Sequence, residues 1–277
     1  MDIATIIGFI VGLGLILFGM VDSVTKTIPQ TFLNYQGIAI VLGGTTAATL
    51  INYPLKKILS LFKVAGLTFR GNSVESENEI ISTLVEINIT IRKKGIAGIE
   101  KMIDSVENRF LRNGLQYMTI EKDGEKLLQF LHNEMNHMIR RHLIGQRMFE
   151  NMGTYAPAFG LLGTVMGLIL MMTSQSIGDP TGVSLMQMEN SMNNLLTGMG
   201  VSLVTTFYGV LLSNLVFNPI SGKLKIRSEE EIYINEMMIM GIQSIHQKEH
   251  HLKMVEKLLT FLDKNAKEFH RSENESL

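Results

Sequence analysis

The residues that could do chemistry in this sequence are hydroxyls set inside long apolar segments. Residues 157–172 read PAFGLLGTVMGLILMM and hold one hydroxyl, Thr164, among three glycines. A later segment has small or polar residues at i, i+4, i+7 and i+11, which is one narrow helix face: Ser202, Thr206, Gly209 and Ser213. Either each hydroxyl bonds the carbonyl one turn back in its own helix, or the two faces form a shared surface that is wet or contacts a partner.

Other reactive groups are scarce. The chain has no cysteine, which excludes disulfides, thiolate nucleophiles and zinc-thiolate sites. His246 and His250 have a spacing that can bind a metal on a helix, but Lys248, Glu249 and Lys253 around them favour a solvated face. The glycine-rich runs lack the lysine of a phosphate-binding loop. Neither a catalytic triad nor a carboxylate pair can be assembled, so we expect no enzyme. A net charge of -1 gives no reason to expect nucleic acid as a partner.

The hydroxyls are positioned by segments that predict membrane spans. Four segments contain no charged residue: 3–21, 32–51, 155–177 and 195–216. The first has enough residues to cover about 28 Å as a helix, which suffices for ~30 Å of hydrocarbon. No Lys or Arg precedes it, so we interpret it as a retained span rather than a signal peptide. The second is the least apolar of the four. We therefore expect a multi-pass protein in contact with membrane lipid.

The basic residues predict the orientation. All 25 Lys and Arg residues except Lys26 lie in residues 55–152 or from Lys223 onward. By the positive-inside rule, both of these regions and both termini are cytoplasmic. Apolar residues at helical spacing, such as Ile80, Leu84 and Ile87, predict helices in both regions, and no period-two pattern suggests strands. The expected fold is all-α: a polytopic membrane protein with four transmembrane helices, a helical cytoplasmic domain at 55–152 and a helical tail at 223–277.

The spans also lack a feature that ion carriers need. An ionisable group inside a membrane costs ~3 kcal/mol or more and is kept there for function. None of the four segments contains Asp, Glu, Lys, Arg or His. If this chain moves ions, a partner must supply the acid.

Four stretches resemble one known family. They are MDIATIIGFIVG at the start, EINITIRKKGIAGIEKMI at 86–103, APAFGLLGTVMGLILMM at 156–172 and VTTFYGVLLSNLVFNPISGKL at 204–224. Together they resemble the MotA/PomA flagellar stator proteins nearly end to end. The TTFYG and NP residues of the last stretch look closer to the PomA-like, sodium-type branch.

The resemblance implies a machine in the bacterial inner membrane. Five copies of this subunit would surround two copies of a single-span MotB/PomB-like partner, whose aspartate carries the ion. Torque would pass through the cytoplasmic loop to the rotor protein FliG. No cofactor would be bound, and the transported ion would be Na+ rather than H+. Members of the family that are driven by protons often have alanine at the position of Thr164, which favours sodium here. TolQ/ExbB proteins have a threonine there and use protons, so H+ stays an alternative.

The resemblance also assigns residues one by one. Thr164 and Thr206 match threonines that line the ion path, with Thr205 beside them. Pro157 and Pro219 match prolines at the entrance of the third span and the exit of the fourth. Pro157 could act as a hinge or could simply be a first-turn proline. Arg92 and Glu100 match the pair that meets the rotor.

Two alternative functions stay open. A TolQ/ExbB-like, proton-driven energiser of an envelope protein would typically have three spans and an outside N-terminus, so the segment at 32–51 argues against it. A membrane scaffold without ion flux would need no ion path at all.

Overall fold

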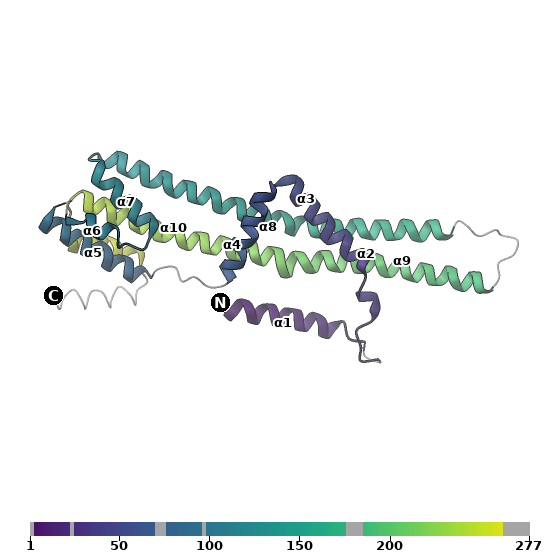
Figure 1. Cartoon of the computed structure of the whole chain (residues 1–277). Helices are drawn as coiled ribbons and strands as arrows, with labels where there is room; N and C mark the ends of the chain where they lie inside the picture. The colour runs from purple at the N-terminus through teal and green to yellow at the C-terminus, as the bar shows by residue number, and fades with distance from the viewer. Residues whose placement is uncertain (1–2, 23–24, 70–75, 96–97, 176–184, 263–277) are drawn as a thin grey trace. The chain divides into compact units, whose positions relative to one another are not determined.

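The computed structural model describes residues 3–22, 25–69, 76–95, 98–175 and 185–262, and every regular element in these ranges is helical (Figure 1). The predicted connector at 178–194 and the last part of the tail lie partly outside them. The chain forms two compact units: residues 1–72 with 143–225, and residues 73–142 with 226–277. The predicted 55–152 domain is thus divided between the units, and its cytoplasmic location stays a prediction.

The first unit is built from apolar helices. Its elements are α1 (Ile3–Gly19), the short η1 (Gln30–Phe32), α2 (Tyr35–Ile38), η2 (Ala39–Gly43), α3 (Gly44–Asn52), α4 (Leu55–Phe69), the later part of α8 (Gly124–Gln175), α9 (Leu185–Leu212), η4 (Ser213–Phe217) and the start of α10 (Asn218–His246). Elements α2, η2 and α3 follow one another without a break. The chain then turns at Pro54, where the helices on either side are bent by 117°. A proline lacks the N–H that would continue the helix, which explains the turn.

By length and composition, two helices could cross a membrane, Gly124–Thr173 and Gly198–His246. The bent pair, Gln30–Asn52 with Leu55–Gly66, would make a third if it forms one span. Ile3–Gly19 is a shorter apolar helix of 17 residues. The described chain is therefore an all-α membrane protein with two or three candidate spans, and the four-span arrangement stays a prediction.

Helix α8 corrects the expected entrance of the third span. The sequence predicts a cytoplasmic domain that ends at residue 152 and a separate span that begins at residue 155, but α8 is a single helix of 52 residues that includes both positions. Pro157 lies inside it, so the interpretation as a first-turn proline is wrong. Prolines are tolerated inside membrane helices where a neighbour satisfies the carbonyl that they leave without a donor.

Pro219 lies at a different kind of irregularity. Residues Ser213–Phe217 form a π-helical turn, in which the Asn218 N–H bonds the carbonyl of Ser213, five residues back. Pro219 follows as the second residue of α10. A wider turn directly before a proline relieves the clash of its ring with the preceding carbonyls, so the helix continues past it.

The second unit resembles a small soluble helical domain. It contains α5 (Glu77–Lys94), α6 (Glu100–Ile103), α7 (Arg109–Ile120), the first part of α8, most of α10, α11 (His251–Leu258) and η5 (Leu259–Phe261). The predicted face of α5 is confirmed: Ile80, Leu84, Ile87 and Ile91 are all buried in one aliphatic core. Ser76 and Glu79 form a capping box at its start, and Gly95 ends it with φ 72°.

One expectation for this unit is wrong. The apolar residues Ile99, Met102, Ile103 and Val106 suggest a single helix, but α6 ends at Ile103. Asn108 then caps a new helix by accepting hydrogen bonds from the backbone N–H groups of Phe110 and Leu111. His246 and His250, for which the sequence favours a solvated face over a metal site, do not share a helix. His246 ends α10 and His250 is the N-cap of α11, so their spacing is not that of a metal pair.

Candidate functional site

Helices α8 and α9 meet along a row of glycines in the first unit. We call the glycine seam the contact made by Gly160, Gly163 and Gly167 of α8 with Gly209 and its neighbours on α9. A Cβ on Gly160 would lie 2.9 Å from the Thr205 carbonyl oxygen, and one on Gly209 would lie 2.6 Å from the Ala156 carbonyl oxygen. These are backbone atoms, so the helices approach more closely than any side chain would allow. Figure 1 shows the two helices alongside each other.

The Thr164 hydroxyl lies on this seam and faces Thr206. Their two Oγ1 atoms are 3.2 Å apart. The Thr164 hydroxyl also lies 2.8 Å from the carbonyl oxygen of Leu161 in its own helix, and the Thr206 hydroxyl lies 3.5 Å from that of Gly160. Both residues are half-buried. The structure therefore brings together two of the predicted ion-path residues and leaves part of each accessible from outside the subunit.

Ser202 and Thr205 are more deeply enclosed. The Ser202 hydroxyl lies 2.9 Å from the Gly198 carbonyl oxygen and 3.2 Å from that of Thr164. Thr205 is completely buried and donates to the Ser202 carbonyl at 2.8 Å. Its methyl group would lie 2.9 Å from a Cβ on Gly37, and a Cβ on Gly163 would meet its side chain at 2.7 Å. Thr205 thus fills the space between α2, α8 and α9 and holds the seam in register.

Ser213 explains how α8 tolerates Pro157. Without an N–H, Pro157 cannot bond the carbonyl of Gly153, four residues earlier. The Ser213 hydroxyl donates to that carbonyl at 2.6 Å, and Asn218 in turn donates to the Ser213 oxygen at 3.2 Å. Ser213, the last residue of the predicted polar face, is therefore hydrogen-bonded to α8. Pro157 and Pro219 are linked through this short series of hydrogen bonds around the π turn.

Tyr208 is a structural residue that the sequence analysis missed. Its hydroxyl donates to the carbonyl of Phe32 and accepts from the backbone N–H of Asn34 at 3.1 Å. Asn34 caps α2 by accepting from the N–H of Gly37. Tyr208 therefore ties α9 to the start of α2. The sequence could have indicated this role, because Tyr208 is two residues after Thr206 in an apolar helix and a tyrosine there needs a partner for its hydroxyl.

The predicted rotor pair lies in the second unit. Arg92 is exposed in the last turn of α5, and Glu100 is the first residue of α6. Residues 96 and 97 between them are outside the described part of the chain. Helix α11 packs against α5, and burial lowers the pKa of His251 there, with the charges of His250 and Arg92 acting in the same direction.

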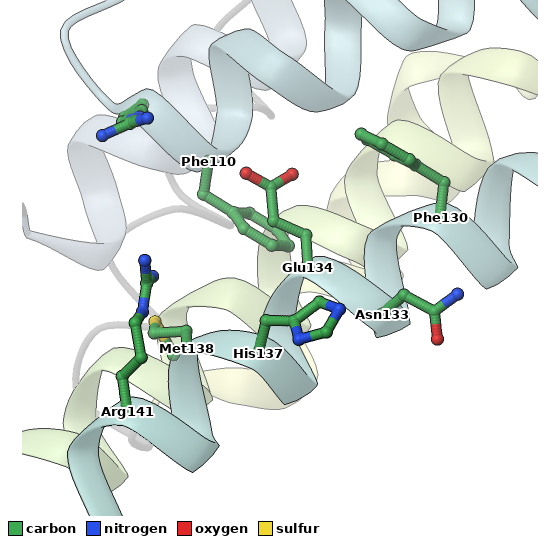
Figure 2. A pocket seen from close by; sticks show the side chains of 8 residues that line it. Phe110, Phe130, Asn133, Glu134, His137, Met138 and Arg141 are labelled. Carbon is green, nitrogen blue, oxygen red and sulfur yellow. The ribbon is translucent and has the colours of Figure 1, made fainter.

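An open groove of about 550 Å3 lies beside α7 and α8 in the same unit (Figure 2). Arg109, Arg141 and Glu134 line it together with the rings of Phe110 and Phe130. Asn113 donates to one Glu134 oxygen at 2.7 Å, while the other oxygen is buried without a hydrogen-bond partner. In the described ranges, no group of three or more His, Cys, Asp or Glu could hold a metal ion.

Known proteins are similar to this chain over nearly its whole length. Residues 102–237 match the MotA/TolQ/ExbB proton channel family. Motility protein A of Treponema phagedenis is 32% identical over 96% of this chain and 96% of its own length. The chain belongs to the MotA/TolQ/ExbB proton channel family.

The relatives correct one part of the expected resemblance. Chemotaxis protein PomA of Vibrio alginolyticus is 29% identical over 88% of this chain and 89% of its own length, which is no more than the match to motility protein A. The predicted preference for the PomA-like branch is therefore not supported. Membership of a channel family confirms that the chain is not an enzyme.

The likeness extends to three dimensions. The flagellar MotAB stator complex of Bacillus subtilis contains a chain that superimposes with a TM-score of 0.79 at 28% identity, covering 94% of this chain and 96% of that one. The glycine seam is therefore part of a channel-family fold, and its threonines lie on the helices that carry the family match.

Proposed function

We propose that this chain is the MotA-like stator subunit of an ion-driven bacterial flagellar motor. The observation that carries the proposal is the Thr164–Thr206 hydroxyl pair, partly open on a seam of two apolar helices that have no ionisable residue at 155–177 or 195–216. Such a face can ligand or wet a passing ion but cannot bind and release it through an acid of its own. The likeness to a MotAB complex supports the same function.

The acid comes from a second protein. In this proposal a MotB/PomB-like single-span partner places its aspartate beside Thr164 and Thr206, with Thr205 holding the backbone behind them. Five copies of this chain surround two copies of the partner in the inner membrane. The four spans of this chain are 3–21, 32–51, 155–177 and 195–216. Both of its termini lie in the cytoplasm, as the distribution of basic residues favours.

Two prolines and two charged residues connect ion flow to torque. Pro157 and Pro219 interrupt the hydrogen-bond ladders where α8 and α10 carry on, so these are the positions at which the helices bend most readily. Arg92 and Glu100 lie in the other unit and contact charged residues of the rotor protein FliG.

The transported ion is Na+ rather than H+ in this proposal. A hard cation prefers several oxygen ligands, and one carboxylate supplies two. The hydroxyls of Thr164 and Thr206, 3.2 Å apart, could supply two more. A proton would need only the carboxylate.

The experiment measures the swimming speed of cells that express this chain and its partner and no other stator proteins. The speed is recorded against sodium concentration at fixed pH, with and without a protonophore. We expect speed to follow sodium and to resist the protonophore. Speed that ignores sodium and collapses with the protonophore would assign the proton, while leaving the stator function intact. Cells that swim equally well without the chain would refute the stator function itself.

A further inference from the structure

An apolar groove of about 550 Å3 lies in the first unit between α1 and the beginning of α10. Ile6, Gly8 and Phe9 line it from α1. Leu215, Pro219 and Ile220 line it from the π turn and the residues after it. It is separate from the glycine seam, since none of its lining residues belongs to α8.

The groove exists because the backbone of α1 lies close to Leu215 at Gly12 but not at Gly8. A Cβ on Gly12 would lie 3.2 Å from the Leu215 side chain, whereas one on Gly8, a turn earlier, would meet nothing within 4 Å. No residue of α1 is buried. The helix thus touches its neighbour near Gly12 and leaves an open apolar space beside Gly8.

Positive charge marks one end of this space. The Lys223 ammonium donates to the Thr5 hydroxyl at 2.6 Å. Lys223 is one helical turn beyond Pro219 and Ile220 in α10, so this charge lies at the end of the groove. Lys225 follows and is exposed. Basic side chains just beyond an apolar span lie at the depth of lipid headgroups and attract anionic ones. Their aliphatic stems can line the apolar surface while their charges stay in the polar layer.

We infer that this groove binds an anionic phospholipid. One acyl chain lies against Gly8, Phe9 and Leu215, and the headgroup phosphate lies against Lys223. The match is one of both shape and charge: an apolar channel whose one hydroxyl, that of Thr5, is bonded to the ammonium group of Lys223. At this depth of a membrane the surrounding medium is hydrocarbon, so an apolar space of this size is filled by acyl chain or by protein.

The first test counts lipid. The chain is purified with its single-span partner, washed with detergent, and the retained phosphatidylglycerol is measured by mass spectrometry. Gly8→Leu fills the groove and should remove about one retained lipid per subunit. Gly14→Leu is the matched control, because Gly14 is on the same helix and also has nothing within 4 Å. Equal lipid retention in the two variants would overturn the inference.

A second test does not depend on how Gly8→Leu folds. Lys223→Gln should shift the retained lipid from phosphatidylglycerol toward phosphatidylethanolamine, whereas the same change at Lys63, an exposed lysine of α4, should not. Unchanged lipid composition in the Lys223 variant would contradict a headgroup site.

Crosslinking identifies the occupant directly. Complexes reconstituted in vesicles that contain phosphatidylglycerol with a diazirine on its acyl chain should label the peptides around Phe9 and Leu215. A photoreactive residue in place of Phe9 that crosslinks to a second copy of this chain, with no lipid labelling, would show that protein covers the groove. Neither result bears on the stator proposal, which rests on α8 and α9.

Discussion

The α8–α9 contact of the first unit and the core of the second unit pack by opposite means. In the first, α8 and α9 meet through glycines and hydroxyls, and Gly209 approaches the backbone of Ala156 and Pro157 directly. In the second, the core consists of large aliphatic side chains, with Leu84, Leu115 and Leu131 fully buried. In the proposed arrangement the first unit lies in lipid and the second in water, and the difference follows from these two surroundings. Water drives apolar side chains together, whereas lipid gives no such drive and rewards close backbone contact and interhelical hydrogen bonds.

The largest expected effect is in the second unit. Leu84→Ala leaves a cavity in a closed aliphatic core and should destabilise this unit by about 2–5 kcal/mol. Leu252→Ala removes the same atoms from a side chain that is 49% exposed and should cost less than about 0.5 kcal/mol. Thermal or denaturant unfolding of the purified chain measures both. Similar losses in the two variants would show that this core is not close-packed.

The glycine seam should be destabilised by an added methyl group rather than by the loss of a side chain. Gly209→Ala places a methyl group 2.6 Å from a backbone oxygen, so α8 and α9 must separate, at a cost of about 1–3 kcal/mol. Gly200→Ala on the same helix meets nothing within 4 Å and should be neutral or stabilising, because alanine favours a helix over glycine. The melting temperature and the yield of complex with the partner would separate the two. A neutral Gly209→Ala would mean that the helices are less tightly joined than described.

An ion pair gives the second unit a pH dependence. Hydrogen bonds from Lys257 and then Lys253 lower the pKa of Glu249 from 4.5 to about 2. The stabilisation is therefore complete above about pH 4.5 and is lost as the pH falls toward 2. Glu249→Gln should flatten the decline of the melting temperature over this window. A variant whose melting temperature declines as steeply as that of the wild type would contradict this role of Glu249.

The smallest individual effects are expected at the rotor pair. Exposed charge pairs contribute about 0.2–1 kcal/mol each, so Arg92→Glu or Glu100→Arg alone should slow swimming only in part. Reversing both should nearly abolish recruitment of the stator to the motor. Fluorescence of labelled stators at the motor measures this, with Lys122→Glu and Glu125→Lys as a charge reversal elsewhere on the exposed surface of the same unit. Full recruitment of the Arg92 and Glu100 double variant would remove these residues from the rotor surface.

The sequence predicts elements that depend on one helix better than contacts between helices. The α5 face and its Gly95 end follow from spacing and backbone preference alone. The series from Ser202 to Ser213 is correctly predicted to be one face, but most of it packs against α8, and Ser213 replaces the hydrogen bond that Pro157 cannot make. No local pattern could show this, because the donor and the acceptor are 60 residues apart.

The same limit explains the errors in element boundaries. Pro157 suggests an interruption only if its helix is considered alone, and His246 and His250 have helical spacing only if the helix continues between them. In the structure, the cap at His250 starts α11 instead. The lipid groove is likewise invisible in the sequence, since it arises from where Gly12 touches and Gly8 does not.

The central claim is that the Thr164 hydroxyl serves the ion path rather than helix packing, and ion uptake tests it most directly. Vesicles containing the chain and its partner are compared for wild type, Thr164→Val, Thr164→Ser and Thr173→Val. Valine keeps the shape of the threonine side chain and removes its oxygen. Losing one oxygen ligand should weaken ion binding by about 1–1.5 kcal/mol, which corresponds to a roughly tenfold lower flux. Thr173 is the matched control, because it is on the same helix and its hydroxyl, like that of Thr164, bonds the carbonyls three and four residues back. We predict that Thr164→Val loses roughly tenfold in ion uptake with assembly unchanged, while Thr164→Ser and Thr173→Val retain it. Full uptake by an assembled Thr164→Val complex would contradict the account.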